Sequence, residues 1–285
     1  MSDLAKKQNI GVALYPQAQF DASINPWVSK LVRGDGWWNS WFDRYRTFIL
    51  YNADLAEQTN ASALIIGEPS LLPALPNGKY PDGSASNVPL DAEGRWRKLI
   101  KEIRAHYKGS LVWALPYPDG VKSPPKFITE VDQVYVLWSA RLTGKNNSSS
   151  QANMTARMGQ LLDESLLPLK NTFKKPVIVA INYASVAGSA EGCVKSNDKC
   201  LQFSTLDQPV PDNPDVQLDL NGQQDIYNAI LVAINQRKWI DGIVSRGYYP
   251  PTILQDKSSS IHGKPAADSL WYWYPRMLTQ APNPN

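Results

Sequence analysis

The sequence predicts an α/β fold in which parallel strands alternate with helices, and three observations support this prediction. Apolar runs bounded by Gly or Pro, typical of buried strands, recur along the 285 residues. Segments with apolar residues at spacings of three and four, typical of amphipathic helices, lie between these runs. No internal repeat or linker divides the chain, so we expect residues 1–285 to form a single domain.

Six segments are expected to be strands. The clearest is 63–67, in which four apolar residues lead into Gly67. The expected strands are 9–16, 63–67, 111–117, 131–140, 176–183 and 239–248. The number six leaves two architectures open, because a doubly wound open sheet accommodates six strands, whereas a closed (β/α)8 barrel would lack two.

Five segments have the periodicity of helices. In the first, Trp38, Trp41, Phe42 and Tyr45 begin an apolar face that continues for several turns. The expected helices are 37–60, 92–107, 155–173, 223–237 and 265–278. Pro168 lies inside the third helix and is a candidate break. A long irregular loop is expected over 184–219.

Composition excludes several classes of function. The net charge is +3 without a Lys/Arg cluster, which argues against a nucleic-acid partner. No apolar run approaches the roughly 18 residues of a membrane span. Segment 1–8 is polar and lacks the apolar stretch of a signal peptide, so the protein is cytoplasmic or its leader lies outside this sequence. Ten Trp and thirteen Tyr suit either sugar stacking or ordinary packing.

The motifs of other enzyme classes are missing. We find no Gly-rich phosphate loop, which argues against nucleotide enzymes. A Gly-x-Ser-x-Gly elbow is also absent, and His106 and His262 lie far apart in sequence, so a Ser-His-Asp triad is not expected. The chemistry must therefore come from other residues, and no cofactor is implied.

Glu68 has the strongest indication of chemistry. It directly follows the strand 63–67, and Pro69 comes next. Catalytic groups gather at the C-terminal ends of strands in (β/α)8 barrels. Burial against apolar surface would raise the pKa of such a carboxyl group, as a general acid in glycoside hydrolysis requires. The alternative is a Glu that ends a strand and caps the following helix.

Cys193 and Cys200 are the two cysteines, and the six residues between them form a largely polar, turn-like segment. We expect a disulfide that closes a small loop, which would imply an oxidising compartment. Two free thiols are the alternative. Two Cys with no nearby His make a poor zinc site, so no metal is expected.

Several short segments follow one another in a familiar order, beginning with an aromatic helix that leads to Gly67 and Glu68. The others are RWRKLI at 95–100, SLVWA at 110–114, VDQVY at 131–135, KPVIV at 175–179, WIDG at 239–242 and GKPAA at 263–267. This order resembles the clan A glycoside hydrolases and is most similar to the family 113 β-mannanases. The resemblance covers nearly the whole chain.

The resemblance implies a (β/α)8 TIM-barrel type of fold, in which the six strands are strands three to eight. It implies a glycoside hydrolase that cleaves a β-linked polysaccharide or oligosaccharide with two carboxyl groups and without cofactor or metal. The first two strands would be missing from an N-terminally truncated chain, supplied by an upstream segment or a second chain, or replaced by other segments. A polysaccharide substrate and a disulfide together suggest an extracellular or cell-surface location.

The resemblance also assigns catalytic roles. The fourth barrel strand of the family ends in a Glu that acts as general acid/base, and Glu68 matches it. The family's nucleophile is a Glu at the end of strand seven, where this chain has Asn182. Because hydrolysis needs a second carboxyl group about 5 Å away when retaining, or about 6.5–9.5 Å away when inverting, another residue must supply it.

Three residues are candidates for the second carboxylate. Asp119 follows the strand 111–117, although a Pro-Asp-Gly turn explains it without chemistry. Glu191 lies next to Cys193 in the long loop, where it could equally be solvated. Asp21 follows the first strand and is the weakest candidate, since helix capping or solvent exposure explains it.

Candidate substrate-binding residues lie near the predicted strand ends. We expect Trp138 to form an aromatic platform for a sugar, and Asn182 and Tyr183 to bind hydroxyl groups. Arg246 is expected to pair with an active-site carboxylate or a substrate acid. Tyr248 and Trp37 are expected to line the cleft. Core packing is the alternative for Trp138 and for one of Trp37 and Trp38. If the second carboxylate is missing altogether, the alternative function is a catalytically inactive carbohydrate-binding protein on a glycosidase-like barrel.

Overall fold

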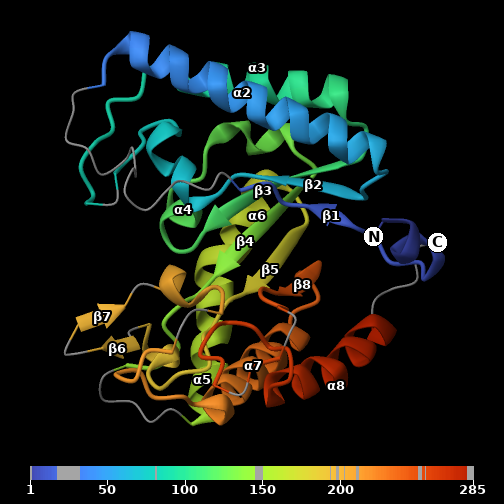
Figure 1. Cartoon of the computed structure of the whole chain (residues 1–285), viewed down its shortest axis with the longest axis vertical. Helices are drawn as coiled ribbons and strands as arrows, with labels where there is room; N and C mark the ends of the chain where they lie inside the picture. Colours follow the sequence, from blue (N-terminus) through green and yellow to red (C-terminus); the bar gives the residue numbers. More distant parts are fainter. Residues whose placement is uncertain are drawn as a thin grey trace. The chain divides into compact units, whose positions relative to one another are not determined.

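The computed structural model describes residues 2–17, 33–80, 82–144, 150–192, 194–196, 199–201, 203–209, 212–249, 252–253 and 255–280. Within them, six parallel strands form one sheet in the order β1-β2-β3-β4-β5-β8, so successive strands are neighbours (Figure 1). The strands are β1 (Ala13–Leu14), β2 (Ala63–Ile66), β3 (Ser110–Pro116), β4 (Gln133–Trp138), β5 (Val177–Ile181) and β8 (Gly242–Ser245). All six lie within or next to expected ranges, which confirms the parallel α/β prediction.

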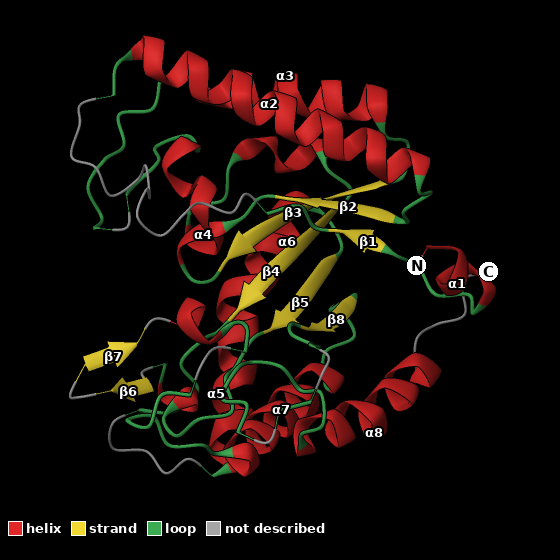
Figure 2. Cartoon of the chain, viewed as in Figure 1, coloured by secondary structure: helices red, strands yellow, loops and turns green. Residues whose placement is uncertain are grey.

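Helices separate the strands along the chain (Figure 2). The α-helices are α1 (Ser2–Lys7), α2 (Asp35–Gln58), α3 (Ala92–His106), α4 (Asp119–Lys122), α5 (Gln151–Leu161), α6 (Leu167–Phe173), α7 (Leu220–Asn235) and α8 (Pro265–Gln280). Short 3-10 helices are η2 (Pro69–Ala74), η3 (Lys126–Glu130), η5 (Ser189–Glu191) and η6 (Phe203–Leu206). All five expected helices are present.

The third expected helix is interrupted where Pro168 suggested a break. A π-helical turn, η4 (Leu162–Leu166), separates α5 from α6. Pro168 lies in the first turn of α6, where a missing backbone N–H costs nothing because that donor has no partner inside the helix. The periodicity of the segment therefore continues through the interruption.

The chain divides into two compact units, Met1–Tyr135 (unit 1) and Val136–Asn285 (unit 2), and the boundary falls inside β4. In unit 1, α2 and α3 pack against each other. An aromatic cluster forms the core. The ring centroid of Trp96 lies 5.7 Å from that of Phe42 and 5.3 Å from that of Trp113. The ring centroids of Trp113 and Phe127 are 4.6 Å apart. Much of the aromatic content of this unit therefore serves packing.

In unit 2, α7 packs against both α5 and α8, and β5 pairs with β8. The long segment after β5 contains structure that the sequence did not predict. The strands β6 (Val194–Ser196) and β7 (Lys199–Leu201) form an antiparallel hairpin. A small apolar cluster of Ala184, Val186, Val194, Leu206 and Val216 fixes this segment. Because Leu206 belongs to this cluster, the end of η6, directly before Asp207, is packed against the rest of unit 2.

Among the helices of the described residues, none combines the length and the apolar character that a membrane crossing requires.

Candidate active site

Gly67 places Glu68 at the C-terminal end of β2. Its φ of +88° belongs to a region that side-chain-bearing residues rarely adopt. A Cβ atom on Gly67 would lie 2.8 Å from the carbonyl oxygen of Ala114 and 3.0 Å from the ring of Trp113. The chain can therefore leave β2 this close to β3 only because residue 67 is glycine.

Glu68 is buried, with 8% of its surface exposed. Its extended backbone precedes η2, and its carbonyl accepts a hydrogen bond from Leu71 N at 3.0 Å, but its side chain does not cap that helix. Burial raises the pKa of Tyr45, and the negative charge of Glu68 raises it further. The Glu68 carboxyl group thus lies close enough to the buried Tyr45 phenol to raise its pKa. Helix capping does not explain the presence of Glu68, because its side chain makes no capping hydrogen bond.

Trp37 is half-buried beside a stacked guanidinium. The Arg33 guanidinium carbon lies 4.8 Å from the Trp37 ring centroid and 4.9 Å from that of Tyr80. Arg33 also donates to the Tyr80 hydroxyl at 2.6 Å. Such cation–π stacking fixes the orientation of both rings. Trp38 is completely buried, which fits the packing alternative for one member of the Trp37–Trp38 pair.

The sequence-based candidates for the second carboxylate have few contacts. Asp119 is exposed and begins α4, where its carbonyl accepts from Ser123 N, an arrangement that favours the turn interpretation. Glu191 ends η5, and its amide donates to Gly188 O at 2.9 Å. Asp21 lies outside the described residues. The catalytic roles of these three residues stay predictions.

Asn182 directly follows β5, and its side chain reaches a carboxylate that the sequence did not indicate. Its amide Nδ2 donates to Asp207 Oδ1 at 2.6 Å. Its backbone N–H donates to Trp138 O at 3.0 Å, which continues the strand pairing. Trp138 and Tyr183 are completely buried, and the Tyr183 hydroxyl donates to Ala140 O at 2.5 Å. Burial therefore favours packing for both rings.

Arg246 follows β8, and its backbone N–H donates to Ile181 O at 2.9 Å. Its guanidinium lies 4.0 Å from Asp207 Oδ2. Burial raises the pKa of the Tyr249 phenol. The positive charge of Arg246 opposes this rise, and the negative charge of Asp207 adds to it. The Tyr249 hydroxyl therefore lies within the electrostatic reach of both side chains. Arg246 thus lies at ion-pair distance from Asp207, and its expected role beside an active-site carboxylate or a substrate acid stays a prediction.

A serine-rich segment, 256–264, holds the backbone beyond β8. The amide of Tyr249 and that of His262 both donate to Ser260 Oγ. A Cβ atom on Gly247 would lie 3.0 Å from Ser260 N, so the two stretches touch closely. Gln223 on α7 binds the same segment through the carbonyls of Ser259 and Ser260. The strand end is therefore rigidly supported.

Tyr248 is the most exposed of the candidate binding aromatics. Its ring is 64% exposed and stacks on His262 at 4.4 Å between centroids. The His262 Nδ1 atom lies 3.1 Å from Tyr249 O, which fixes the imidazole plane. An exposed ring that is held on one face suits the stacking of a sugar on the other.

Cys193, one partner of the expected disulfide, lies outside the described residues. Cys200 lies in β7, opposite Lys195 of β6. The bond between Cys193 and Cys200 stays a prediction. Within the described ranges, no group of three or more His, Cys, Asp or Glu side chains is arranged to hold a metal ion.

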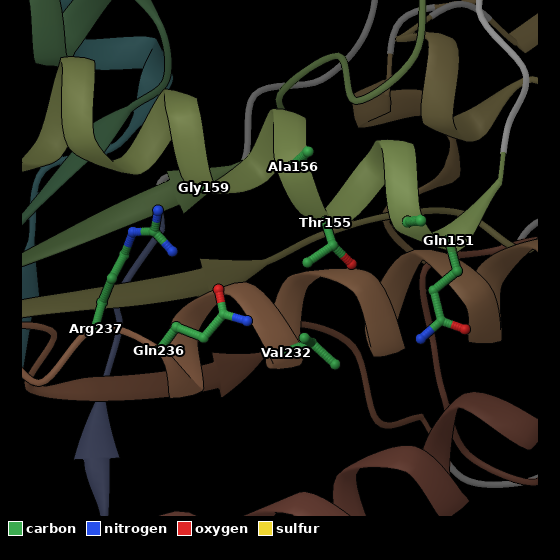
Figure 3. Close-up of a pocket in the computed structure, with 8 residues that line it drawn as sticks. Gln151, Thr155, Ala156, Gly159, Val232, Gln236 and Arg237 are labelled. Carbon is green, nitrogen blue, oxygen red and sulfur yellow. The ribbon is translucent and has the colours of Figure 1, made fainter.

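A shallow pocket of about 620 Å³ lies between α5 and α7 in unit 2 (Figure 3). Its lining includes Thr155 and Gln236, together with Arg237, which makes a bidentate ion pair with Asp163 at 2.7–2.8 Å. None of the candidate catalytic or binding residues lines it. It belongs to the helical layer, so we do not assign it to the strand-end chemistry.

Comparison with known proteins shows the fold. No protein-family profile and no curated protein matches the sequence. A solved GH113 β-1,4-mannanase has 18% identity and a TM-score of 0.65 over 96% of this chain and 76% of its own. The GH113 β-mannanase AaManA from Alicyclobacillus acidocaldarius has 17% identity and a TM-score of 0.64, over 97% and 76%.

A β-glucuronidase from Faecalibacterium prausnitzii is a further likeness, with 13% identity, a TM-score of 0.55, and coverage of 96% of this chain but 40% of its own. At these identities the likeness concerns the fold alone. The chain therefore shares the glycosidase-like (β/α)8 barrel fold of the GH113 β-mannanases, and its described residues form six of the strands.

Proposed function

We propose that this protein is a glycoside hydrolase that cleaves a β-linked polysaccharide or oligosaccharide, with Glu68 as general acid. The observation that carries the proposal is the placement of Glu68: a buried carboxyl group at the C-terminal end of β2 that is not used to cap a helix. Barrel enzymes collect catalytic groups at this end of the strands. A buried acid can protonate the oxygen of a leaving sugar.

The similar structures support the substrate class. They include β-mannanases and β-glucuronidases, all of which are named for β-linked glycosides. We therefore place β-mannan first among substrates, followed by β-glucan, xylan and galactan. The exposed Tyr248 ring supports a role in binding the sugar.

The test is sugar release from this panel by the wild type and by Glu68→Gln. We expect the wild type to release sugar and Glu68→Gln to lower kcat by about 10²–10⁴-fold, because general acid catalysis contributes about this much. The matched control is Glu130→Gln, which removes a surface acid of the same unit that pairs with Arg97. This control should keep wild-type activity.

A second substrate sharpens the test. An aryl glycoside with a good leaving group needs little protonation, so Glu68→Gln should cleave it far better than it cleaves the natural linkage. Equal losses on both substrates would contradict the general-acid role of Glu68. No release of any sugar by the folded wild type would contradict the hydrolase.

One observation favours a second function. The end of β5 carries Asn182 instead of the carboxylate that the resemblance implies. A protein without a second carboxylate would bind carbohydrate and not hydrolyse it. Binding without release, measured by calorimetry on the same panel, would support this alternative.

A further inference from the structure

A carboxyl group and a guanidinium lie close together in unit 2, near the ends of β5 and β8. The guanidinium of Arg246, which follows β8, lies 4.0 Å from Asp207 Oδ2. This separation exceeds the length of a hydrogen bond, which is about 2.7–3.2 Å. An oxygen atom that accepts from the guanidinium and donates to the carboxyl group fits between them.

The described residues leave part of the hydrogen-bonding capacity of both groups unused. A guanidinium has five N–H donors. That of Arg246 donates no hydrogen bond to the described residues, although its side chain is only 21% exposed. Asp207 Oδ1 accepts from the Asn182 amide at 2.6 Å, whereas Oδ2 accepts from none of these residues. A ligand that pairs with both groups therefore gains affinity.

Hydrogen bonds to neighbouring segments hold both groups in place. The carbonyl of Asp207 accepts from Ser259 Oγ at 2.9 Å. Asn182, whose side chain fixes one oxygen of the carboxyl group, is itself only 6% exposed. The backbone N–H of Arg246 donates to the last residue of β5 at 2.9 Å. A ligand that binds here meets groups that are already ordered, so little conformational entropy is lost.

A sugar hydroxyl matches this arrangement better than a sugar acid does. A hydroxyl group donates one hydrogen bond and accepts others, so the same oxygen serves Arg246 and Asp207 Oδ2 together. An ionised sugar acid offers acceptors only. It would pair with Arg246 but leave Asp207 Oδ2 beside a second acceptor. The pair therefore favours a neutral sugar unit over a uronic acid.

We propose that Asp207 and Arg246 form a subsite that binds a hydroxyl group of a neutral sugar unit, with Asn182 holding the carboxyl group in position. The inference deepens the proposed function and rests on its carbohydrate substrate. It assigns Arg246 to a neutral hydroxyl group in place of a substrate acid. Neutral polysaccharides, and not polyuronides, are therefore the substrate class.

The experiment measures binding by calorimetry in the Glu68→Gln background, in which hydrolysis is suppressed. The two main probes are β-linked mannotetraose and β-linked tetramannuronate, which carries a carboxylate in place of each primary alcohol. Cellotetraose, xylotetraose and β-linked galactotetraose complete the neutral set. We expect the best neutral tetraose to bind at least about 10-fold more tightly than tetramannuronate.

Substitution of the pair should remove this preference. In Asp207→Asn, an amide N–H donor replaces the acceptor Oδ2. We expect its affinity for the neutral tetraose to fall about 10-fold and its affinity for tetramannuronate to rise. Arg246→Met should bind the neutral tetraose about 10–100-fold more weakly.

Asp212→Asn is the matched control for the change of charge. Asp212 is an exposed acid of the same loop as Asp207 and pairs with Lys257. Its substitution removes one carboxyl group without touching the subsite, so the preference for the neutral tetraose should persist. Circular dichroism checks the fold of each variant. Asp207→Asn keeps the size of the side chain and decides the question even if Arg246→Met does not fold.

The outcomes separate this inference from the proposed function. A preference that Asp207→Asn leaves unchanged, as in the Asp212→Asn control, would overturn the subsite. Tighter binding of tetramannuronate than of every neutral tetraose, or binding of none of these probes, would also overturn it. Sugar release by the wild type would leave the hydrolase in place in each of these cases. A neutral preference that depends on Asp207, in a protein that releases no sugar, would keep the subsite and overturn the hydrolase.

Discussion

Gly67 and Gly83 have nearly the same backbone dihedral but different surroundings. Their φ values are +88° and +84°. A Cβ atom at Gly67 would meet Ala114 O at 2.8 Å, whereas one at Gly83 would meet no atom within 4 Å. The pair therefore separates the cost of a positive φ from the cost of a steric clash beside the candidate acid.

We predict that Gly67→Ala lowers the free energy of unfolding by about 2–4 kcal/mol, because the clash with β3 adds to the dihedral strain. Gly83→Ala should cost only about 1–2 kcal/mol, the strain alone. Urea denaturation of both variants measures the difference. Equal losses would mean that the close approach of β2 to β3 contributes nothing to the need for glycine.

At the scale of elements, the segment 256–264 depends on a buried ion pair. Lys264 Nζ lies 3.1 Å from Asp256 Oδ2 and donates to Ser185 Oγ and to Ser258 O, each at 2.9 Å. Both charged side chains are almost fully buried. Removal of one partner leaves the other charge buried without compensation.

We predict that Lys264→Met destabilises the protein by about 3–5 kcal/mol. The double variant Lys264→Met with Asp256→Asn should recover part of this loss, because the uncompensated carboxylate is gone while the side-chain oxygen that accepts from Ser258 N remains. Urea denaturation of the two single variants and the double variant gives the coupling energy. Additive losses would show that the two side chains are not coupled.

The same lysine predicts a dependence on pH. Burial lowers the pKa of Lys264 below its ordinary value of 10.5, and Asp256 opposes this shift. Between the lowered pKa and 10.5, the unfolded chain binds more protons at this residue than the folded chain. The free energy of unfolding of the wild type should therefore increase as the pH rises through this window. Lys264→Met lacks the titrating amine and should not show this increase.

The comparison is made by urea denaturation at several pH values from 8 to about 10.5. The tyrosines that also titrate in this range are common to both proteins, so the difference between the wild type and Lys264→Met isolates the lysine. A difference that stays constant across the range would contradict the predicted effect.

At the scale of the whole molecule, carbohydrate binding should stabilise the fold even where hydrolysis is blocked. A ligand that binds only the folded state, at ten times its Kd, stabilises it by about 1.4 kcal/mol. For a chain of this size we expect the Tm of Glu68→Gln to rise by about 2–4 °C with oligosaccharides of the substrate. Differential scanning calorimetry with an equal concentration of an α-linked oligosaccharide is the control. A rise of the same size with both sugars would argue against a site for β-linked chains.

Local patterns determined most of the fold of this protein. The helices and strands follow from apolar periodicity, which acts over a few residues and is visible in one sequence. Glu68 was found in the same way, because it directly follows a buried strand and a Gly. The 3-10 helices and the β6–β7 hairpin were missed, since short elements in a polar segment have no period to detect.

Only the tertiary structure brought Asp207 to Asn182. Twenty-five positions separate the two residues, and nothing in the loop around Asp207 distinguishes it from other acids of the chain. Its position depends on contacts that are distant in sequence: Leu206 in an apolar cluster and Ser259 on its backbone. The sequence by itself determined the parallel α/β fold and the candidate acid, because both arise from local patterns. The pairing of Asp207 with Asn182 required the folded chain, because long-range packing selects which loop carboxylate lies at a strand end.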